Sequence, residues 1–277
     1  MQRGKGAGGP NLDLLAACFP FLFPLPVPPT TLALLFLAGL AGGFIDAIAG
    51  GGGLISVPAL LAAGLPPQIA LGTNKFQSSC GTIVAVVRYA RAGMMKTPWL
   101  WLAVAGSFIA SMAGAHVVTL VDNAVLKKLI PWMLAAVAIY TAINPRFGLH
   151  VGRAHFAPIA FALLFGSVLG FYDGFFGPGT GSFWTVAGVA LLGLDLRHAT
   201  GYTKAANLAS NLGSLAIFLG SKSVHFPAGA AMIAGQLIGA QLGSGFVIKH
   251  GAKFIRPVFL AVVCALTLKL IWDGFRH

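Results

Sequence analysis

The chain has 277 residues, of which 57% are hydrophobic and only 9% are charged, and its formal net charge is +12. Because soluble domains carry about 25% charged residues, this composition argues against a soluble fold and for a protein that lies in lipid. Lysine and arginine fall in short gaps between apolar runs, a distribution typical of membrane proteins and not of nucleic-acid-binding domains.

Along the chain, residues 1–31 are predicted to be an N-terminal extension, disordered or leader-like, because prolines interrupt the apolar stretch after Arg3 and Lys5. Apolar segments then follow one another, and most reach the roughly 17–25 residues that a membrane-spanning helix needs. The predicted helical segments are 32–49, 53–64, 69–91, 98–120, 127–143, 157–176, 180–193, 198–220, 226–248 and 255–274. The segments 53–64 and 180–193 are too short to span and each follows a glycine-rich break, so each is predicted to form a hairpin with the preceding segment.

The chain repeats itself. Gly43-Phe44-Ile45-Asp46 recurs as Gly170-Phe171-Tyr172-Asp173, and Gly72-Thr73-Asn74-Lys75 recurs as Gly201-Tyr202-Thr203-Lys204. Matches in the same order predict two related halves of about 120 residues each. The predicted division is a first transmembrane repeat at 32–143, a cytoplasmic linker at 144–156 and a second transmembrane repeat at 157–274.

The basic gaps at 88–97, 144–156 and 249–256 are expected on the cytoplasmic side. If each short segment returns as a hairpin, each half has a hairpin plus three spans, and the second half enters the membrane inverted. We therefore predict an all-α polytopic membrane protein of two inverted repeats, with about eight transmembrane helices.

The first candidate site motif is Asp46-Ala-Ile-Ala-Gly-Gly-Gly-Gly, with its counterpart Asp173-Gly-Phe-Phe-Gly-Pro-Gly-Thr. A carboxylate in an apolar helix needs a partner, a hydrated cavity or a proton, and helix N-termini freed at a break can hold an anion. We predict that Asp46 and Asp173 have coupling or gating roles. The predicted anion-binding positions at the breaks are Gly50, Gly51, Gly52, Gly53, Gly177, Gly179 and Thr180. The alternative is that the glycines only allow close packing and each Asp caps a broken helix.

The second motif places Lys75 and Lys204 near the start of long apolar segments. A buried ammonium needs an anion or a carboxylate, so the two lysines and nearby polar groups are predicted to attract the substrate. These further candidate positions are Asn74, Gln77, Thr203, Asn207 and Asn211. Alternatively, the lysines extend to the membrane interface or neutralise Asp46 and Asp173.

A third pattern consists of small residues spaced three or four apart, which favours close helix packing: Gly106, Ser107, Ala110 and Gly114, matched by Gly235, Gly239 and Gly243. Gln236 and Gln241 on the same stretch are candidates for a central cavity or for interhelical hydrogen bonds. The three cysteines and the histidines lack metal-binding spacing, and no Walker A or catalytic signature is present. No cofactor, no metal and no enzyme activity are therefore predicted.

Together, the segments 43–54, 73–75 and 170–183 resemble the TauE/SafE family of proposed sulfite and organosulfur anion exporters, and within it the YfcA-like branch. The resemblance covers roughly residues 32–274 and implies a multi-pass protein of the inner membrane that carries a small anion such as sulfite or a sulfonate. The expected function is a secondary transporter of a small anion, with the lipid bilayer and that solute as its partners and no nucleic acid. The alternatives are a passive anion channel and a non-transporting membrane assembly or interaction protein.

Overall fold

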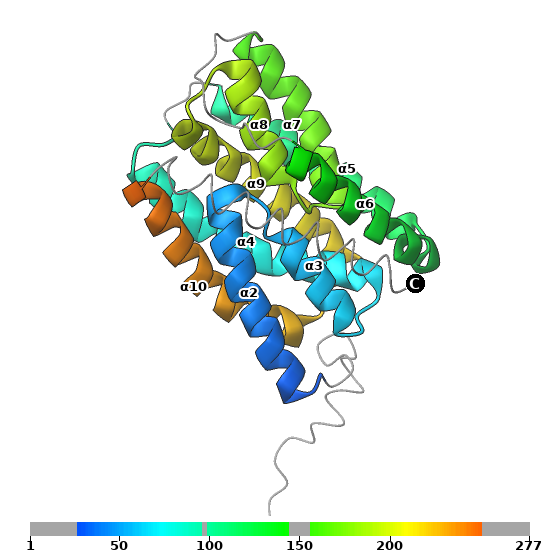
Figure 1. Cartoon of the computed structure of the whole chain (residues 1–277). Coiled ribbons are helices and arrows are strands. Elements are labelled where there is room, and N and C mark those ends of the chain that lie inside the picture. Colours follow the sequence, from blue (N-terminus) through cyan, green and yellow to red (C-terminus); the bar gives the residue numbers. More distant parts are fainter. Residues whose placement is uncertain (1–26, 96–98, 144–155, 251–277) are drawn as a thin grey trace, which may run out of the picture.

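The computed structural model describes residues 27–95, 99–143 and 156–250 (Figure 1). Within these ranges the chain is entirely helical, as predicted, and the predicted segments agree with the helices to within a few residues at each end. The predicted extension (but for its last residues), the linker (but for Phe156) and the segment 255–274 lie outside the described residues. The nine described helices are α2 (Pro29–Ala49), α3 (Gly53–Ala62), α4 (Pro67–Arg91), α5 (Leu100–Leu120), α6 (Asn123–Ile143), α7 (Pro158–Phe175), α8 (Thr180–Leu192), α9 (Leu196–Gly220) and α10 (Phe226–His250).

Four of the described helices are long and apolar enough to cross a membrane: α2, α5, α7 and α10. Large apolar side chains on their outer faces are exposed, as expected of surfaces that contact lipid; Leu34 on α2 is 66% exposed and Ile109 on α5 is 68% exposed. Helices α4 and α9 are equally long but carry many buried polar side chains, because their neighbours are other helices. The chain is thus a polytopic membrane protein.

Glycines bring the outer helices together in two extensive pairs, α2 with α10 and α5 with α7. A Cβ atom on Gly239 would lie only 2.1 Å from the carbonyl oxygen of Leu40, and one on Gly114 would lie 2.1 Å from that of Phe171. The small-residue pattern therefore allows close helix packing, as predicted.

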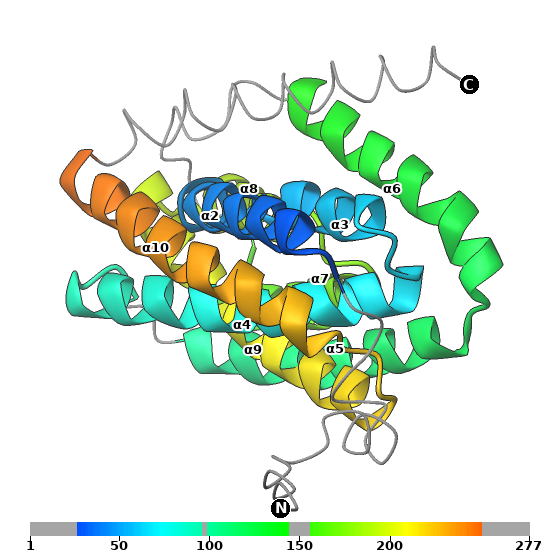
Figure 2. The same cartoon turned by 90° about the horizontal axis from the view of Figure 1, so that it is seen from below.

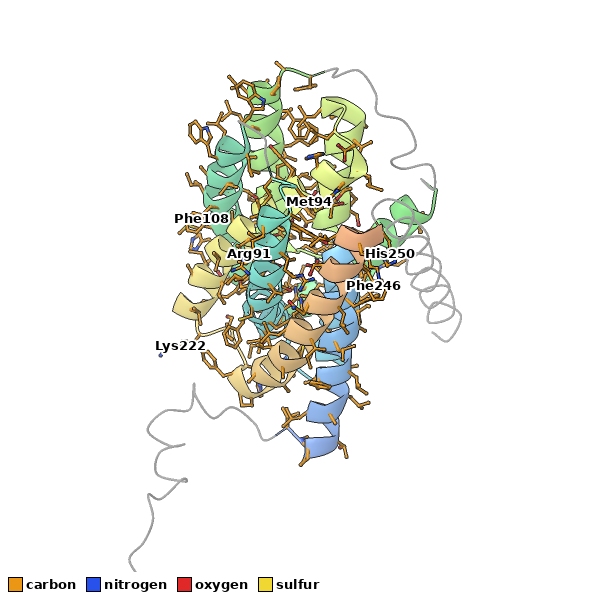
Figure 3. The ribbon with its side chains drawn as sticks, turned by 90° about the vertical axis from the view of Figure 1, so that its left-hand side faces the viewer. Arg91, Met94, Phe108, Lys222, Phe246 and His250 are labelled. Carbon is orange, nitrogen blue, oxygen red and sulfur yellow. The ribbon has the colours of Figure 1, made fainter. Side chains whose placement is uncertain are left out.

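The contacts also fix the direction in which the helices run. Near the start of α4, Gly72 lies against Ser223, which precedes α10. Near the end of α4, the Arg88 side chain lies against Gly245 on α10, so the two helices run parallel. Lys222, just before α10, therefore lies at the opposite end of the α4–α10 pair from Arg91 and His250 (Figure 3).

In the same way, α2 runs parallel to α10 and α7 runs parallel to α5, whereas α4 and α9 run antiparallel, with Gly72 near Phe218 and Gly201 near Met94.

The antiparallel pair α4 and α9 occupies the middle of the bundle and contacts helices on all sides. Helix α6 lies at its periphery (Figure 2). Much of the buried polar chemistry of the described residues sits on α4 and α9, including both lysines of the second sequence motif. The fold therefore places two polar helices in the centre and shields them with apolar ones.

Candidate functional site

Two interrupted helices form the frame of the site. Helix α2 ends at Ala49, and Gly50 follows with a φ of 74°. Helix α7 ends at Phe175, after which Gly177 and Gly179 have φ values of 96° and 84°. Residues with a Cβ atom rarely adopt these left-handed conformations, which explains why glycines punctuate both breaks. Gly51 and Gly52 complete the first break, and Gly53 begins α3.

The two breaks touch each other. A Cβ atom on Gly50 would lie 2.4 Å from the Cα atom of Gly181, and one on Gly53 would lie 3.1 Å from the Cα atom of Pro178. The Ser182 hydroxyl donates a hydrogen bond of 3.0 Å to the carbonyl oxygen of Ala49. Two glycine-rich motifs that are far apart in the sequence thus form one contact at the centre of the protein.

Beside this contact lie two ion pairs that link the two sequence repeats crosswise. The Nζ atom of Lys75 is 2.8 Å from Oδ1 of Asp173, and the Nζ atom of Lys204 is 2.8 Å from Oδ2 of Asp46. Each lysine therefore neutralises the carboxylate of the other motif. This is the neutralisation that the sequence left open as an alternative, with the partners exchanged between the halves.

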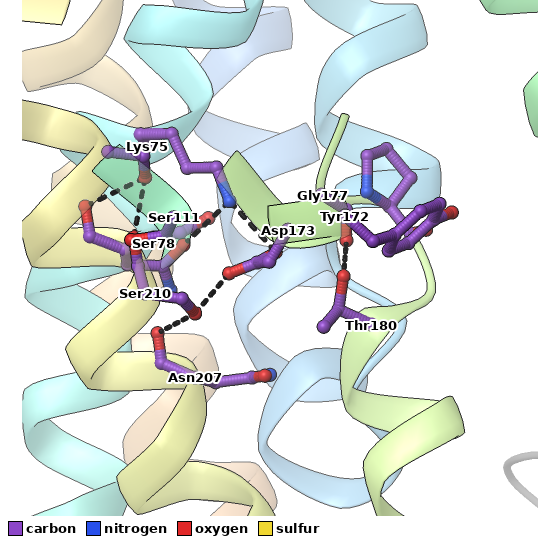
Figure 4. Close-up of polar contacts among 12 residues, drawn as sticks. Lys75, Ser78, Ser111, Tyr172, Asp173, Gly177, Thr180, Asn207 and Ser210 are labelled. Atoms are coloured by element: carbon purple, nitrogen blue, oxygen red, sulfur yellow. Dashed lines mark hydrogen bonds and ion pairs between the residues drawn. The ribbon is translucent and has the colours of Figure 1, made fainter. Parts of the chain in front are cut away.

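The Lys75–Asp173 pair has further polar partners (Figure 4). The Ser210 hydroxyl donates to Oδ2 of Asp173, and Lys75 donates a second hydrogen bond of 3.2 Å to Oδ1 of Asn211. A Cβ atom on Gly177 would lie 2.9 Å from Nζ of Lys75, so this ammonium rests against the second break. The side chains of Lys75 and Asp173 are only 2% and 5% exposed.

The Lys204–Asp46 pair is held differently. Lys204 is fully buried, whereas 14% of the Asp46 side chain is exposed. Among the described residues, the side chains of Lys204 and Asp46 are hydrogen-bonded only to each other. The two pairs are equivalent in the sequence but not in the structure.

The remaining predicted positions divide between the site and its surroundings. Thr180 opens α8 and its hydroxyl donates to Gly177 O at 2.7 Å. Thr203 is hydrogen-bonded to Thr185, with 3.0 Å between their hydroxyl oxygens.

On α4, Oδ1 of Asn74 accepts a 3.0 Å hydrogen bond from Gln77. These two amides contact each other and neither is hydrogen-bonded to a lysine or carboxylate of the ion pairs.

Asn207 lies between the two pairs on α9, one turn from both Lys204 and Ser210. It is 6% exposed, and its side-chain Oδ1 is buried without a partner in the described part of the chain. Its Nδ2 atom would lie 2.9 Å from a Cβ atom on Gly181, which places the amide against the contact between the two breaks.

Sequence reasoning missed Ser210 and Ser182, which contact Asp173 and Ala49. Ser210 is separated from the predicted Asn207 and Lys204 by one and two helical turns, so the helical spacing of polar residues on α9 is the signal that identifies it. Of the two candidate glutamines, Gln241 is exposed, whereas Gln236 is buried beside Gly43 and Gly81, with its Oε1 unpartnered among the described residues.

An apolar cavity of about 700 Å³ lies between α6 and the second hairpin. Val137 lines this cavity, and a Cβ atom on Gly179 would lie 2.3 Å from Cγ1 of Val137. The cavity therefore extends to the second break. Among the described residues that line it, Tyr172 alone carries a hydroxyl, and this hydroxyl already donates to Pro178 O at 2.8 Å. The described lining is therefore better suited to an apolar group than to an anion.

Comparison with known proteins finds related membrane proteins. The family model described as sulfite exporter TauE/SafE matches residues 35–270. A "Probable membrane transporter protein" of Haemophilus influenzae is 40% identical over 89% of this chain and 97% of its own length.

The "Probable membrane transporter protein YfcA" of Escherichia coli K12 is 39% identical over 90% of this chain and 92% of its own length. An Arabidopsis thaliana protein named "Sulfite exporter TauE/SafE family protein 5" is 37% identical over 30% of this chain and 18% of its own length. No solved structure matches the chain significantly.

Proposed function

We propose that this chain, which belongs to the TauE/SafE family of membrane transporters, is a secondary transporter of a small anion. The family is not an enzyme family. The observation that carries the proposal is the pair of buried, crossed ion pairs beside two helix breaks in contact. Such charges are costly in lipid and mark transport pathways. No ATP-binding motif is present in the sequence, so an ion gradient is the proposed source of energy.

The proposed architecture is a pair of inverted repeats. It is supported by the directions of corresponding helices. Helix α2 runs parallel to α4 and α10, and its counterpart α7 runs parallel to α5 and α9. Because α9 is antiparallel to α4, α7 is also antiparallel to α2. Transporters built in this way bind their solute near the bilayer midplane, at discontinuous helices between the repeats, and rocking of one repeat against the other exposes the site alternately.

In this proposal the anion binds between the breaks, near Gly50 to Gly53 and Gly177 to Thr180. Lys75 and Lys204 supply positive charge, and Asp46 and Asp173 compete with the anion for the lysines and so act as gates. The ion pairs form a closed seam in this conformation, because none of the four side chains is more than 14% exposed. A closed seam suits the occluded state of a carrier, and the flux experiment below separates a carrier from a channel.

The membrane side follows from charge. Basic residues gather at the end of the bundle where α4 and α10 finish, including Arg88, Arg91 and Lys249. The positive-inside rule makes this the cytoplasmic end of a protein in the bacterial inner membrane. Sulfite or an organosulfonate, carried outward, is the proposed substrate class, and the family and the names of its relatives are what support it.

The test is flux into proteoliposomes that contain the purified chain. Sulfite, sulfoacetate and thiosulfate are supplied under an imposed proton gradient. We expect saturable flux of at least one of these anions that responds to the gradient and that is lost in both Asp46→Asn and Lys75→Gln. Normal flux in either folded variant overturns the assigned roles. Flux that neither saturates nor responds to the gradient identifies a channel.

A further inference from the structure

The two ion pairs differ in how many contacts fix them. The carboxylate of Asp173 has both oxygens occupied, one by Lys75 and the other by Ser210, and Lys75 is also bound to Asn211. Separating this pair would also break the bond from Ser210 to Asp173 or the bond from Lys75 to Asn211, depending on which charged group moves, and this adds to the cost of separating the charges. The geometry is that of a fixed clamp.

The Lys204–Asp46 pair has no such support. The position on α4 that corresponds to Ser210 is Gly81, and a glycine cannot donate a side-chain hydrogen bond to Asp46. The space next to Gly81 is filled by Gln236, whose Cγ atom lies 2.3 Å from the place of a Cβ on that glycine. Asp46 therefore keeps one oxygen free of described partners and is the most exposed of the four charged groups.

Donors for an anion lie at the contact between the two breaks, one turn along α9 from Lys204. Asn207 follows one turn later on α9, is buried, and makes no side-chain hydrogen bond among the described residues. Its amide nitrogen faces Gly181, in the first turn of α8, and the residue that precedes α8 is Gly179, which has no side chain to cap the helix. The Thr180 N–H already donates to Gly177 O, so the N–H groups of Gly181 and Ser182 are the ones left to attract an anion at this helix N-terminus.

We propose that the two pairs have different tasks: Lys204–Asp46 opens to admit the anion, and Lys75–Asp173 stays closed as a structural clamp. This inference rests on the proposed anion transport and narrows the roles given above: only Asp46 competes with the anion as a gate, and Lys75 and Asp173 hold the helices together. A small oxyanion replaces the carboxylate of Asp46 on Nζ of Lys204. It accepts further hydrogen bonds from Nδ2 of Asn207 and from the first turn of α8. Asp46 moves toward the side on which it is already exposed.

Charged thiol reagents test this without knowledge of the natural solute. In the full chain, with Cys18, Cys80 and Cys264 replaced by serine, Asp46→Cys and Asp173→Cys are each reconstituted. Modification is timed with two methanethiosulfonates of similar size, one bearing a sulfonate and one bearing a trimethylammonium group. The reaction of each reagent with free cysteine in solution is the control for the intrinsic reactivities of the two reagents.

Relative to that control, we expect the sulfonate reagent to modify the thiol of Asp46→Cys at least tenfold faster than the cationic reagent. Adding Lys204→Gln should abolish this preference. The thiol of Asp173→Cys should react at least tenfold more slowly than that of Asp46→Cys with either reagent. Equal, anion-selective modification of both variants overturns the division of tasks but leaves an anion site between the breaks. Absence of anion preference in both variants overturns the proposed function as well.

Asp46→Cys removes one half of a buried pair and can impair folding, so a second reporter is needed. A Cβ atom on Gly51 meets nothing closer than 3.7 Å, so Gly51→Cys fits the first break and leaves both pairs intact. The thiol of Gly51→Cys is expected to show the same preference for the sulfonate reagent, sensitive to Lys204→Gln and insensitive to Ser210→Ala. A preference that Ser210→Ala removes and Lys204→Gln leaves unchanged assigns the anion to the other pair and overturns the inference.

Discussion

Lys75 on α4 and Asp173 on α7 lie 2.8 Å apart at their charged atoms, although the nearer carboxylate in the sequence is Asp46. The same exchange joins Lys204 to Asp46. Because both pairs are buried, removing one charged side chain leaves its partner buried without a counter-charge and lowers the stability of the protein. The pairing therefore determines which second substitution restores that stability.

A double-mutant cycle tests this crossed pairing. Lys75→Met leaves the Asp173 carboxylate buried without its cation, and Asp173→Leu leaves the Lys75 ammonium buried without its anion. Each single variant should lower the free energy of unfolding by about 3–5 kcal/mol. The matched double variant removes both charges and should recover most of that loss. The mismatched double variant Lys75→Met with Asp46→Leu leaves two orphaned charges and should be the least stable. Thermal unfolding in detergent measures all four, and equal stabilities of the two double variants contradict the exchange.

The contact between the breaks should tolerate no side chain. Gly181→Ala would place a Cβ atom 2.4 Å from the Cα atom of Gly50, so we expect separation of the two hairpins, a lower melting temperature and loss of flux. Gly51→Ala is the matched control, because its Cβ has room, and its melting temperature should stay within a few degrees of that of the wild type. Retention of both properties by Gly181→Ala would show that the breaks can separate without consequence.

Close packing of α2 on α10 gives a third test. Gly235→Ala directs a methyl group at the carbonyl oxygen of Phe36, 2.1 Å away, and the backbones must move apart. We expect a loss of about 1–3 kcal/mol, the usual cost of overpacking. Gly220→Ala, at the end of α9, meets nothing within 4 Å and should be neutral or slightly stabilising. The melting temperatures of the two variants should therefore change in opposite directions or by clearly different amounts.

The turn before α9 predicts a pH dependence. Burial raises the pKa of the Asp195 carboxyl, but hydrogen bonds from the ring and backbone of His198 and from the backbone of Arg197 outweigh burial, and the pKa is held below its usual value. Because the folded pKa is the lower one, the stabilisation is present above the ordinary pKa of aspartate, about 3.9, and is lost as the pH falls through the folded value. Asp195→Asn keeps an oxygen that can cap the helix but cannot titrate.

We therefore expect the stability difference between the wild type and Asp195→Asn to be largest at neutral pH and to vanish under acid conditions. Asp195→Ala, which removes the cap as well, should cost about 0.5–2 kcal/mol at neutral pH. Melting temperatures across a pH series provide the measurement. A difference between wild type and Asp195→Asn that is independent of pH would exclude the carboxylate as its source.

Much of the frame was predictable from the sequence. The breaks at Gly50 and Gly177 could be located because left-handed backbone favours glycine, and the helices could be located because apolar runs of sufficient length leave few alternatives. The crossed pairing was not predictable. Two similar motifs, each with one Asp and one Lys, are electrically balanced whether the charges pair within a motif or between motifs, and only the helix directions decide.

The role of Ser210 escaped prediction for a related reason. The repeat aligns it with Gly81, so comparison of the halves gave it no counterpart and directed attention to the residues that do match. The difference between the two pairs therefore arises where the repeats diverge, at residues that a search for internal symmetry passes over.

The exchange of partners also bears on how the protein is made. A ribosome delivers Asp46 and Lys75 to the bilayer well before Asp173 and Lys204 have been synthesised, so the final partners of these two charges arrive only with the later helices. Either portion expressed alone could pair only the Asp and the Lys of its own motif, and it could not form the crossed pairs of the folded protein. Two separately synthesised fragments, cut between α6 and α7, would have the same reason to find each other in the membrane as the continuous chain has to fold.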